Sequence, residues 1–242
     1  MTIVPRANRL HERVAALLAR EIVSGRLPTE GPIPSEPELI DEYGVSKTVA
    51  RETVQALSAA NLVTIQHGKR TVVRREGEWN HLSRLVWEAL RAEGRSEPLI
   101  SELYDVRLLL EPMVARKAAE SARPAQIDEI VAALNSMEGA IPIATRDFLE
   151  FDRQFHVTVS SAASSNRILE ALMRDVHELL GTSWKWSKLS DEEVAVVFDQ
   201  HRQIAGAIAA GDANEAEAAM RKHIQWAAAT DRRMGSTSRV DG

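Results

Sequence analysis

Four side chains that could bind a divalent metal stand in a regular pattern in the second half of the chain. Asp152 and His156 are four residues apart in a segment with helical periodicity, so both side chains project from one face of a helix. His201 and His223 flank a turn at residues 211–212. If the flanking segments form an antiparallel helical hairpin, the two histidines lie about 16 and 17 Å from that turn, at 1.5 Å per residue. The two pairs together form a candidate four-ligand metal site.

Three imidazoles and one carboxylate form a donor set that suits Zn²⁺ best, and Ni²⁺, Mn²⁺ or Fe²⁺ as well, with open positions for water or another ligand. Such a site could bind a small molecule, sense the metal itself, stabilise the fold, or activate water for hydrolysis. The chain has no cysteine, which excludes disulfides, thiolate ligands and cysteine nucleophiles. No further general base accompanies the four residues at a recognisable spacing, so we do not expect an enzyme.

The segments that must position these side chains all have helical periodicity. Apolar residues recur at helical spacing in residues 79–92, 99–123, 127–137, 148–160 and 168–180. Two capping boxes, Ser190 with Glu193 and Asp212 with Glu215, predict the starts of the last two helices. No strand pattern follows residue 74, so the body is predicted to be an all-α bundle of six or seven helices.

The first 75 residues have a different pattern. A helix over residues 10–22 is predicted to end near Gly25. Ser35 and Glu38 form a capping box for a short second helix that ends at Gly44, and Ser46 can cap a third. A stripe of apolar residues faces one side of this third helix, while the opposite side carries Lys47, Thr48, Arg51 and Gln55.

Two β-type runs, residues 62–66 and 71–74, follow the third helix and are joined across His67, Gly68, Lys69 and Arg70. Glycine allows a tight turn there, and the flanking cations could reach phosphates. Three helices and a β-hairpin predict a winged helix-turn-helix, so the fold class is mainly α with a small hairpin.

Charge is distributed unevenly along the chain. Residues 1–75 carry 11 Lys and Arg against 8 Asp and Glu, whereas the remainder carries 19 against 27. The whole chain has a net charge of −5. Only the N-terminal part is therefore expected to meet a polyanion.

The motifs at residues 33–39, 45–52 and 62–68 resemble the operator-binding module of GntR-family regulators, and the wing resembles that of the FadR subfamily. The resemblance implies contacts to double-stranded operator DNA from the start of the third helix and the wing. One position departs from the family, which usually has a basic residue where this chain has Pro37. The expected DNA-binding residues are Ser35, Ser46, Lys47, Thr48, Arg51, His67, Gly68 and Lys69.

The second half resembles the metal-binding FCD effector domain of FadR-type regulators, in which Asp152, His156, His201 and His223 match the metal ligands one by one. The segment at residues 106–111 resembles the start of that domain, where an arginine can face the ligand cavity. Arg107 could thus grip a small carboxylic acid, although an Arg107 to Glu111 pair on the surface is the alternative.

The remaining aromatic residues and histidines have less definite roles. Trp184 and Trp186 could line the cavity or pack in the core. Residues 79–82 resemble the opening of the domain in sugar-acid-responsive members. His11, His81 and His177 match no position of the metal pattern, so they are assigned structural or surface roles.

The predicted organisation is a DNA-binding domain over residues 1–75, a linker over 76–78, an effector and dimerisation domain over 79–234, and a flexible tail over 235–242. No run of about 18 apolar residues predicts a membrane span. We expect a cytoplasmic homodimeric repressor that leaves its operator when a small carboxylic acid, of the sugar-acid type, binds at the metal. The alternatives are a metal-sensing repressor and a metal-dependent hydrolase.

Overall fold

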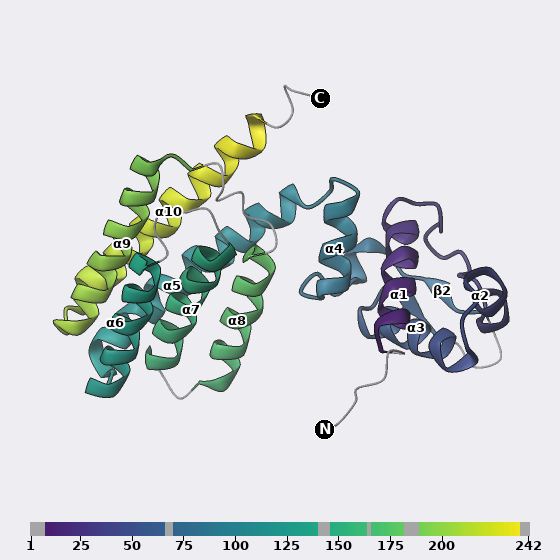
Figure 1. Cartoon of the computed structure of the whole chain (residues 1–242), viewed down its shortest axis with the longest axis horizontal. Helices are drawn as coiled ribbons and strands as arrows, with labels where there is room; N and C mark the ends of the chain where they lie inside the picture. The colour runs from purple at the N-terminus through teal and green to yellow at the C-terminus, as the bar shows by residue number, and fades with distance from the viewer. Residues whose placement is uncertain (1–7, 66–69, 140–145, 164–165, 182–188, 238–242) are drawn as a thin grey trace. The chain divides into compact units, whose positions relative to one another are not determined.

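The computed structural model describes residues 8–65, 70–139, 146–163, 166–181 and 189–237. The chain divides into two compact units, residues 1–96 and 97–242. Within the described residues there are ten α-helices and one two-stranded antiparallel sheet (Figure 1). The predicted fold class, a winged helix-turn-helix followed by an all-α bundle, is confirmed.

The first unit holds the three predicted helices and the hairpin. Strands β1 and β2 pair antiparallel, with Val63 opposite Val73 and Thr64 opposite Val72. Leu18, Leu39 and Leu57, one from each helix, are fully buried, so the three helices share one core. The elements are α1 (Asn8–Val23), α2 (Glu36–Tyr43), α3 (Lys47–Ala59), β1 (Val63–Thr64), β2 (Val72–Val73), a 3₁₀ turn (Glu76–Glu78) and α4 (Arg84–Ala92).

The turn between α2 and α3 is defined by its caps. The Ser35 side chain accepts a hydrogen bond from the Glu38 amide, and the Glu38 carboxylate accepts one from the Ser35 amide, which is the predicted capping box. Gly44 ends α2 with φ 63°, a left-handed conformation that favours glycine. Ser46 then caps α3 by accepting from the Val49 amide. These caps fix where the exposed face of α3 begins.

The division between the units lies later than the sequence analysis placed it. Helix α4 packs against α1 and therefore belongs to the first unit, which ends at Ser96. Val86 and Trp87 of α4 are buried, and the Arg95 guanidinium donates to the Val23 carbonyl oxygen at 2.6 Å. The physical reason is that α4 is amphipathic, and packing against α1 removes its apolar face from water.

The second unit is a bundle of six helices in the described part. With α4, the described residues after position 79 hold seven helices, which agrees with the predicted six or seven. The long helix α5 lies at its centre and packs against α7, α9 and α10. Figure 1 shows α6, α7 and α8 on one side of α5, and α9 beside α10. The helices are α5 (Glu97–Ser121), α6 (Pro124–Gly139), α7 (Arg146–Ala163), α8 (Arg167–Gly181), α9 (Asp191–Ala209) and α10 (Ala213–Thr237).

The last two helices form the predicted hairpin. Ser190 and Glu193 cap α9 reciprocally, and Asp212 accepts from the Glu215 amide at the start of α10. Gly211 has φ 71°, which permits the tight turn between the two helices. Helix α10 continues to Thr237, so the first residues of the predicted tail are helical, and residues 238–242 lie outside the described part.

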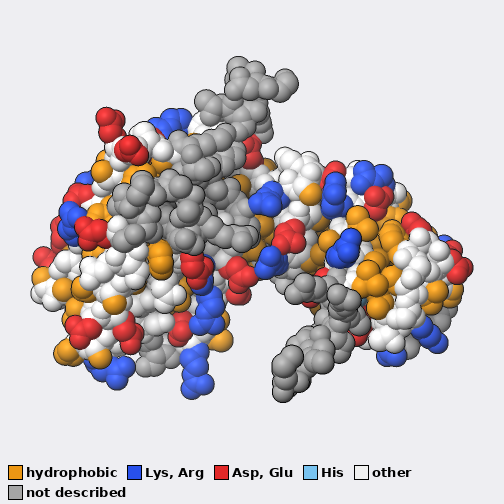
Figure 2. Space-filling view, viewed as in Figure 1, with side chains coloured by type: hydrophobic (Ala, Val, Ile, Leu, Met, Phe, Trp, Pro, Cys, Tyr) orange, Lys and Arg blue, Asp and Glu red, His pale blue; other side chains and the backbone are white. Residues whose placement is uncertain are grey.

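The surface of the bundle carries both signs of charge. Figure 2 shows acidic and basic side chains interspersed over the face of the bundle that is in view. Among the described helices, none is long and apolar enough to cross a lipid bilayer.

Candidate functional site

The structure brings the four predicted metal ligands together inside the second unit. Asp152 and His156 lie on α7, His201 on α9 and His223 on α10. One ligand atom from each side chain lies within 4.8 Å of the others. All four residues are buried, with exposed fractions between 0% and 7%.

The spacing of the ligand atoms suits one small cation. His201 Nε2 lies 3.2 Å from Asp152 Oδ1, and His156 Nε2 lies 3.3 Å from His223 Nε2. Two ligands that each lie about 2.1 Å from a tetrahedral Zn²⁺ are themselves about 3.4 Å apart. The protein therefore holds these donors at distances that one metal ion can bridge.

The hydrogen bonds of the two hairpin histidines support the same conclusion. His201 Nδ1 lies 2.8 Å from the Val197 carbonyl oxygen and His223 Nδ1 lies 3.0 Å from Gln200 Oε1. A neutral imidazole has one N–H, so a ring that donates from Nδ1 has a lone pair on Nε2. Both Nε2 atoms then face other electron-rich atoms, an arrangement that a cation stabilises.

The electrostatics favour the metal-binding protonation states. Burial lowers the pKa of His156 to about 4, and the adjacent Glu111 carboxylate offsets only part of this effect. Burial, with the nearby imidazoles of His201 and His156, holds the pKa of His223 well below its ordinary value. Burial raises the pKa of Asp152, but the close imidazoles outweigh it and keep the pKa low. Neutral imidazoles and an ionised carboxylate are the forms that ligate metals.

Arg107 lies beside this cluster. Its NH2 group is 3.3 Å from His156 Nε2, and its Nε donates to Glu111 Oε1 at 2.5 Å. The i,i+4 pair with Glu111 that the sequence offered as an alternative therefore exists, but it is buried and not on the surface, since both residues are 1% exposed. The guanidinium also lies over the Tyr104 ring, 5.5 Å from its centroid.

His177 is the residue of this region that sequence reasoning missed. It is buried on α8, its ring stacks on that of His156 with 4.6 Å between centroids, and its Nε2 lies 3.1 Å from Glu111 Oε1. Glu111, His156 and His177 form a second group whose ligand atoms lie within 4.8 Å of one another. The available signal was that His177 follows the buried stripe of α8, four residues after Met173.

The predicted DNA-binding residues of α3 all face solvent. Lys47, Thr48 and Arg51 are exposed, on the side of the helix opposite to the core, and Gln55 of the same polar face is exposed as well. Ser35 caps the start of α2, and Ser46 caps the start of α3. His67, Gly68 and Lys69 lie outside the described residues, as do Trp184 and Trp186.

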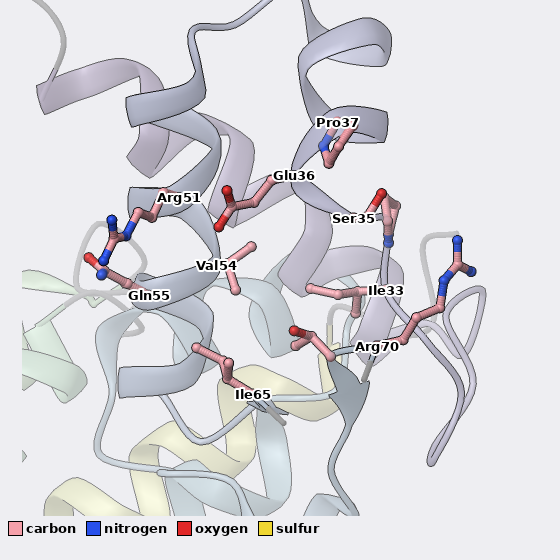
Figure 3. Close-up of a pocket in the computed structure, with 11 residues that line it drawn as sticks. Ile33, Ser35, Glu36, Pro37, Arg51, Val54, Gln55, Ile65 and Arg70 are labelled. Atoms are coloured by element: carbon pink, nitrogen blue, oxygen red, sulfur yellow. The ribbon is translucent and has the colours of Figure 1, made fainter. Parts of the chain in front are cut away.

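A groove runs between α3, the start of α2 and the hairpin (Figure 3). Arg51 and Gln55 project from α3, and Arg70 lies at the hairpin, where it donates to Glu38 Oε1 at 2.9 Å. Arg70 is one of the wing cations that the sequence suggested could reach phosphates, although the predicted set of DNA-binding residues does not include it. The lining residues are Ile33, Pro34, Ser35, Glu36, Pro37, Arg51, Val54, Gln55, Ile65, Arg70 and Thr71.

Two family patterns match the chain. The pattern described as "Bacterial regulatory proteins, gntR family" matches residues 10–73, and that of the FCD domain matches residues 102–225. The first lies within the first unit and the second within the helical bundle.

Curated relatives match along most of the chain. The galactonate operon transcriptional repressor of Escherichia coli is 29% identical over 86% of this chain and 90% of its own length. The HTH-type transcriptional regulator LutR of Bacillus subtilis is 32% identical over 84% and 92%. A solved structure of Lar, which controls the expression of the Listeria monocytogenes agr system, has a TM-score of 0.63 and 15% identity, and covers 96% of this chain and 99% of that chain. The structural likeness bears on the fold.

Proposed function

Since this chain belongs to the GntR family of bacterial regulatory proteins and carries an FCD domain, we propose that it is a repressor that leaves its operator when a small carboxylic acid binds at a metal in the bundle. The observation that carries the proposal is the convergence of Asp152, His156, His201 and His223 beside the buried Arg107. The family consists of transcriptional regulators, so the hydrolase alternative is set aside.

The metal would be held by Asp152 from α7 and by the Nε2 atoms of the three histidines. Zn²⁺ suits this donor set best, and Ni²⁺, Mn²⁺ and Fe²⁺ suit it as well. Once bound, the metal supplies a positive charge and open coordination positions to which a carboxylate oxygen can bind. The histidines come from three helices, so one ion would tie α7, α9 and α10 together.

The effector is proposed to be a hydroxycarboxylic acid of the sugar-acid type. A guanidinium binds carboxylates through parallel N–H donors, and Arg107 lies within reach of the metal ligands. The Escherichia coli relative is named as the repressor of the galactonate operon, and galactonate is an acid of this type. Galactonate is therefore the first compound to test on this chain.

Operator recognition is proposed to involve Ser35, Ser46, Lys47, Thr48 and Arg51, together with the wing residues His67, Gly68 and Lys69. The exposed cations of α3 support this assignment because phosphate contacts dominate affinity for DNA. A palindromic operator requires two winged modules related by a two-fold axis, so the working form is proposed to be a homodimer in the cytoplasm.

Repression would be relieved by linkage. An effector that binds one arrangement of the dimer better than another shifts the population toward that arrangement. If the effector lowers the affinity for operator DNA by some factor, operator DNA lowers the affinity for the effector by the same factor. In the proposed scheme, the effector-bound arrangement places the two α3 helices at a spacing that no longer matches the operator half-sites.

The decisive experiment measures release of operator DNA, selected from a random-sequence pool, by galactonate and other small acids in the presence of Zn²⁺. We expect release to need both the acid and the metal. Release by Zn²⁺ alone would favour a metal-sensing repressor, which uses the same four ligands. Operator binding that neither agent changes would contradict both schemes.

A further inference from the structure

Glu111 is the meeting point of three buried side chains. Its Oε1 accepts from Arg107 Nε at 2.5 Å and lies 3.1 Å from His177 Nε2, while its Oε2 lies 2.6 Å from His156 Nδ1. These partners come from α5, α8 and α7 respectively. The carboxylate therefore links three helices of the bundle at one point.

The contact with His156 determines which ring nitrogen can bind a metal. The buried Arg107 guanidinium is paired with the Glu111 carboxylate, with 2.5 Å between Arg107 Nε and Glu111 Oε1. A carboxylate paired with arginine accepts hydrogen bonds, so its approach to His156 Nδ1 at 2.6 Å favours the tautomer of the ring that carries its proton on Nδ1. The lone pair is then on Nε2, which faces Asp152, His223 and the Arg107 guanidinium.

A second metal ion is a weaker explanation of the same cluster. Glu111, His156 and His177 could supply three ligands, but the Arg107 guanidinium already lies against Glu111 and provides the positive charge. A cation there would also share His156 with the first site. The contacts are better explained as the outer partners of a metal-binding histidine, where a carboxylate behind the ring is a recurrent arrangement.

We infer that Glu111 is a positioning residue that couples the metal site to Arg107, and that His177 holds Glu111 in place. The inference rests on the proposed function, because it gives the metal and the effector a shared partner. An effector carboxylate that draws Arg107 away from Glu111 leaves Glu111 in contact with His156 and His177, so effector binding alters how firmly Glu111 orients His156 toward the metal.

The test titrates the full-length protein with Co²⁺, which reports its coordination through visible absorption bands. For Glu111→Gln we expect Co²⁺ affinity to fall by about 10- to 100-fold, the effect typical of outer partners of metal ligands, and the absorption bands to change. Glu120→Gln is the matched control, since Glu120 lies on the same helix in an exposed pair with Arg116. The control should leave both measurements unchanged.

Removal of His177 gives an independent readout. For His177→Gln we expect a smaller loss of Co²⁺ affinity, about 3- to 10-fold, with bands shifted in the same direction. If Glu111→Gln proves unfolded by circular dichroism, this variant decides, and affinity and bands equal to those of the wild type overturn the inference. A folded Glu111→Gln protein with wild-type affinity and bands overturns it directly.

The result also separates this inference from the proposed function. A wild-type protein that binds no Co²⁺ overturns the metal site and the inference together. If the wild type binds Co²⁺ and folded Glu111→Gln binds it with equal affinity, the positioning role is overturned and the metal site stands.

Discussion

His156 Nε2 and His223 Nε2 lie 3.3 Å apart, although a carboxylate or amide oxygen lies beside the Nδ1 atom of each ring. Each Nε2 atom therefore presents a lone pair to the other, and the Arg107 guanidinium also lies 3.3 Å from the Nε2 atom of His156. Two lone pairs at this separation repel one another in a buried site, whereas a metal ion between them binds both. This contact makes metal content the first property to test.

Loss of either hairpin histidine should abolish tight metal binding. His201→Ala and His223→Ala each remove one of four donors, so we expect Zn²⁺ affinity to fall by more than about 100-fold, beyond the usual effect of an outer partner. Competition against a chromophoric chelator measures the affinity. The control is His81→Ala, a half-buried histidine of the first unit. Affinity within threefold of wild type in both variants would contradict the assigned ligands.

Substitution of Arg107 should separate effector binding from metal binding. Arg107→Lys keeps the charge beside Glu111 but loses the planar pair of donors, so we expect galactonate to bind about 10- to 100-fold more weakly while Zn²⁺ affinity changes little. Calorimetry on the zinc-loaded protein measures both. Unchanged galactonate affinity in the Lys variant would show that Arg107 does not contact the acid.

Substitution of Arg51 should weaken operator binding alone. This side chain is exposed on α3 and lines the groove of Figure 3, so Arg51→Ala is expected to reduce operator affinity by about 10- to 100-fold. Fluorescence anisotropy with labelled operator measures the loss. The control is Arg26→Ala, because Arg26 lies on the loop after α1 and forms an exposed ion pair with Glu21. Equal losses in the two variants would argue against a specific contact by Arg51.

The chelator-treated protein should lose stability as the medium becomes mildly acidic. The pKa of His156 is about 4 in the folded protein and 6.5 ordinarily, so the unfolded chain binds more protons between these values. The stabilisation is fully present above pH 6.5 and is lost as the pH falls toward 4, by on the order of 3 kcal/mol for this group. The low pKa of Glu111 adds to the loss near its ordinary value of 4.5.

Urea unfolding at pH 7 and pH 4.5, followed by circular dichroism, measures this change. His156→Asn should show a weaker pH dependence, because the titrating ring is gone. A free energy of unfolding that is the same at both pH values in the wild type would contradict the burial of a neutral His156.

The sequence predicted the parts of the site that depend on spacing along helices. The distances of His201 and His223 from the turn at Gly211 place their rings at the same level, with 4.4 Å between centroids. The role of His177 could not be predicted, because its partner Glu111 is far away in sequence and only the packing of α8 near α5 brings them together. For the same reason the burial of Arg107 was open, since an i,i+4 spacing is compatible with a surface or a core position.

The packing of α4 on α1 determines which piece of this chain can be exchanged between relatives. Arg20 pairs with Glu93, and Arg95 reaches both Val23 and Glu76, so the helix before residue 97 is bound to the operator-reading unit by several contacts. A chimaera joined after the wing would strip α4 from its apolar partner and expose Trp87. Sensor bundles from other regulators should therefore be grafted at Glu97, where the interchangeable module begins.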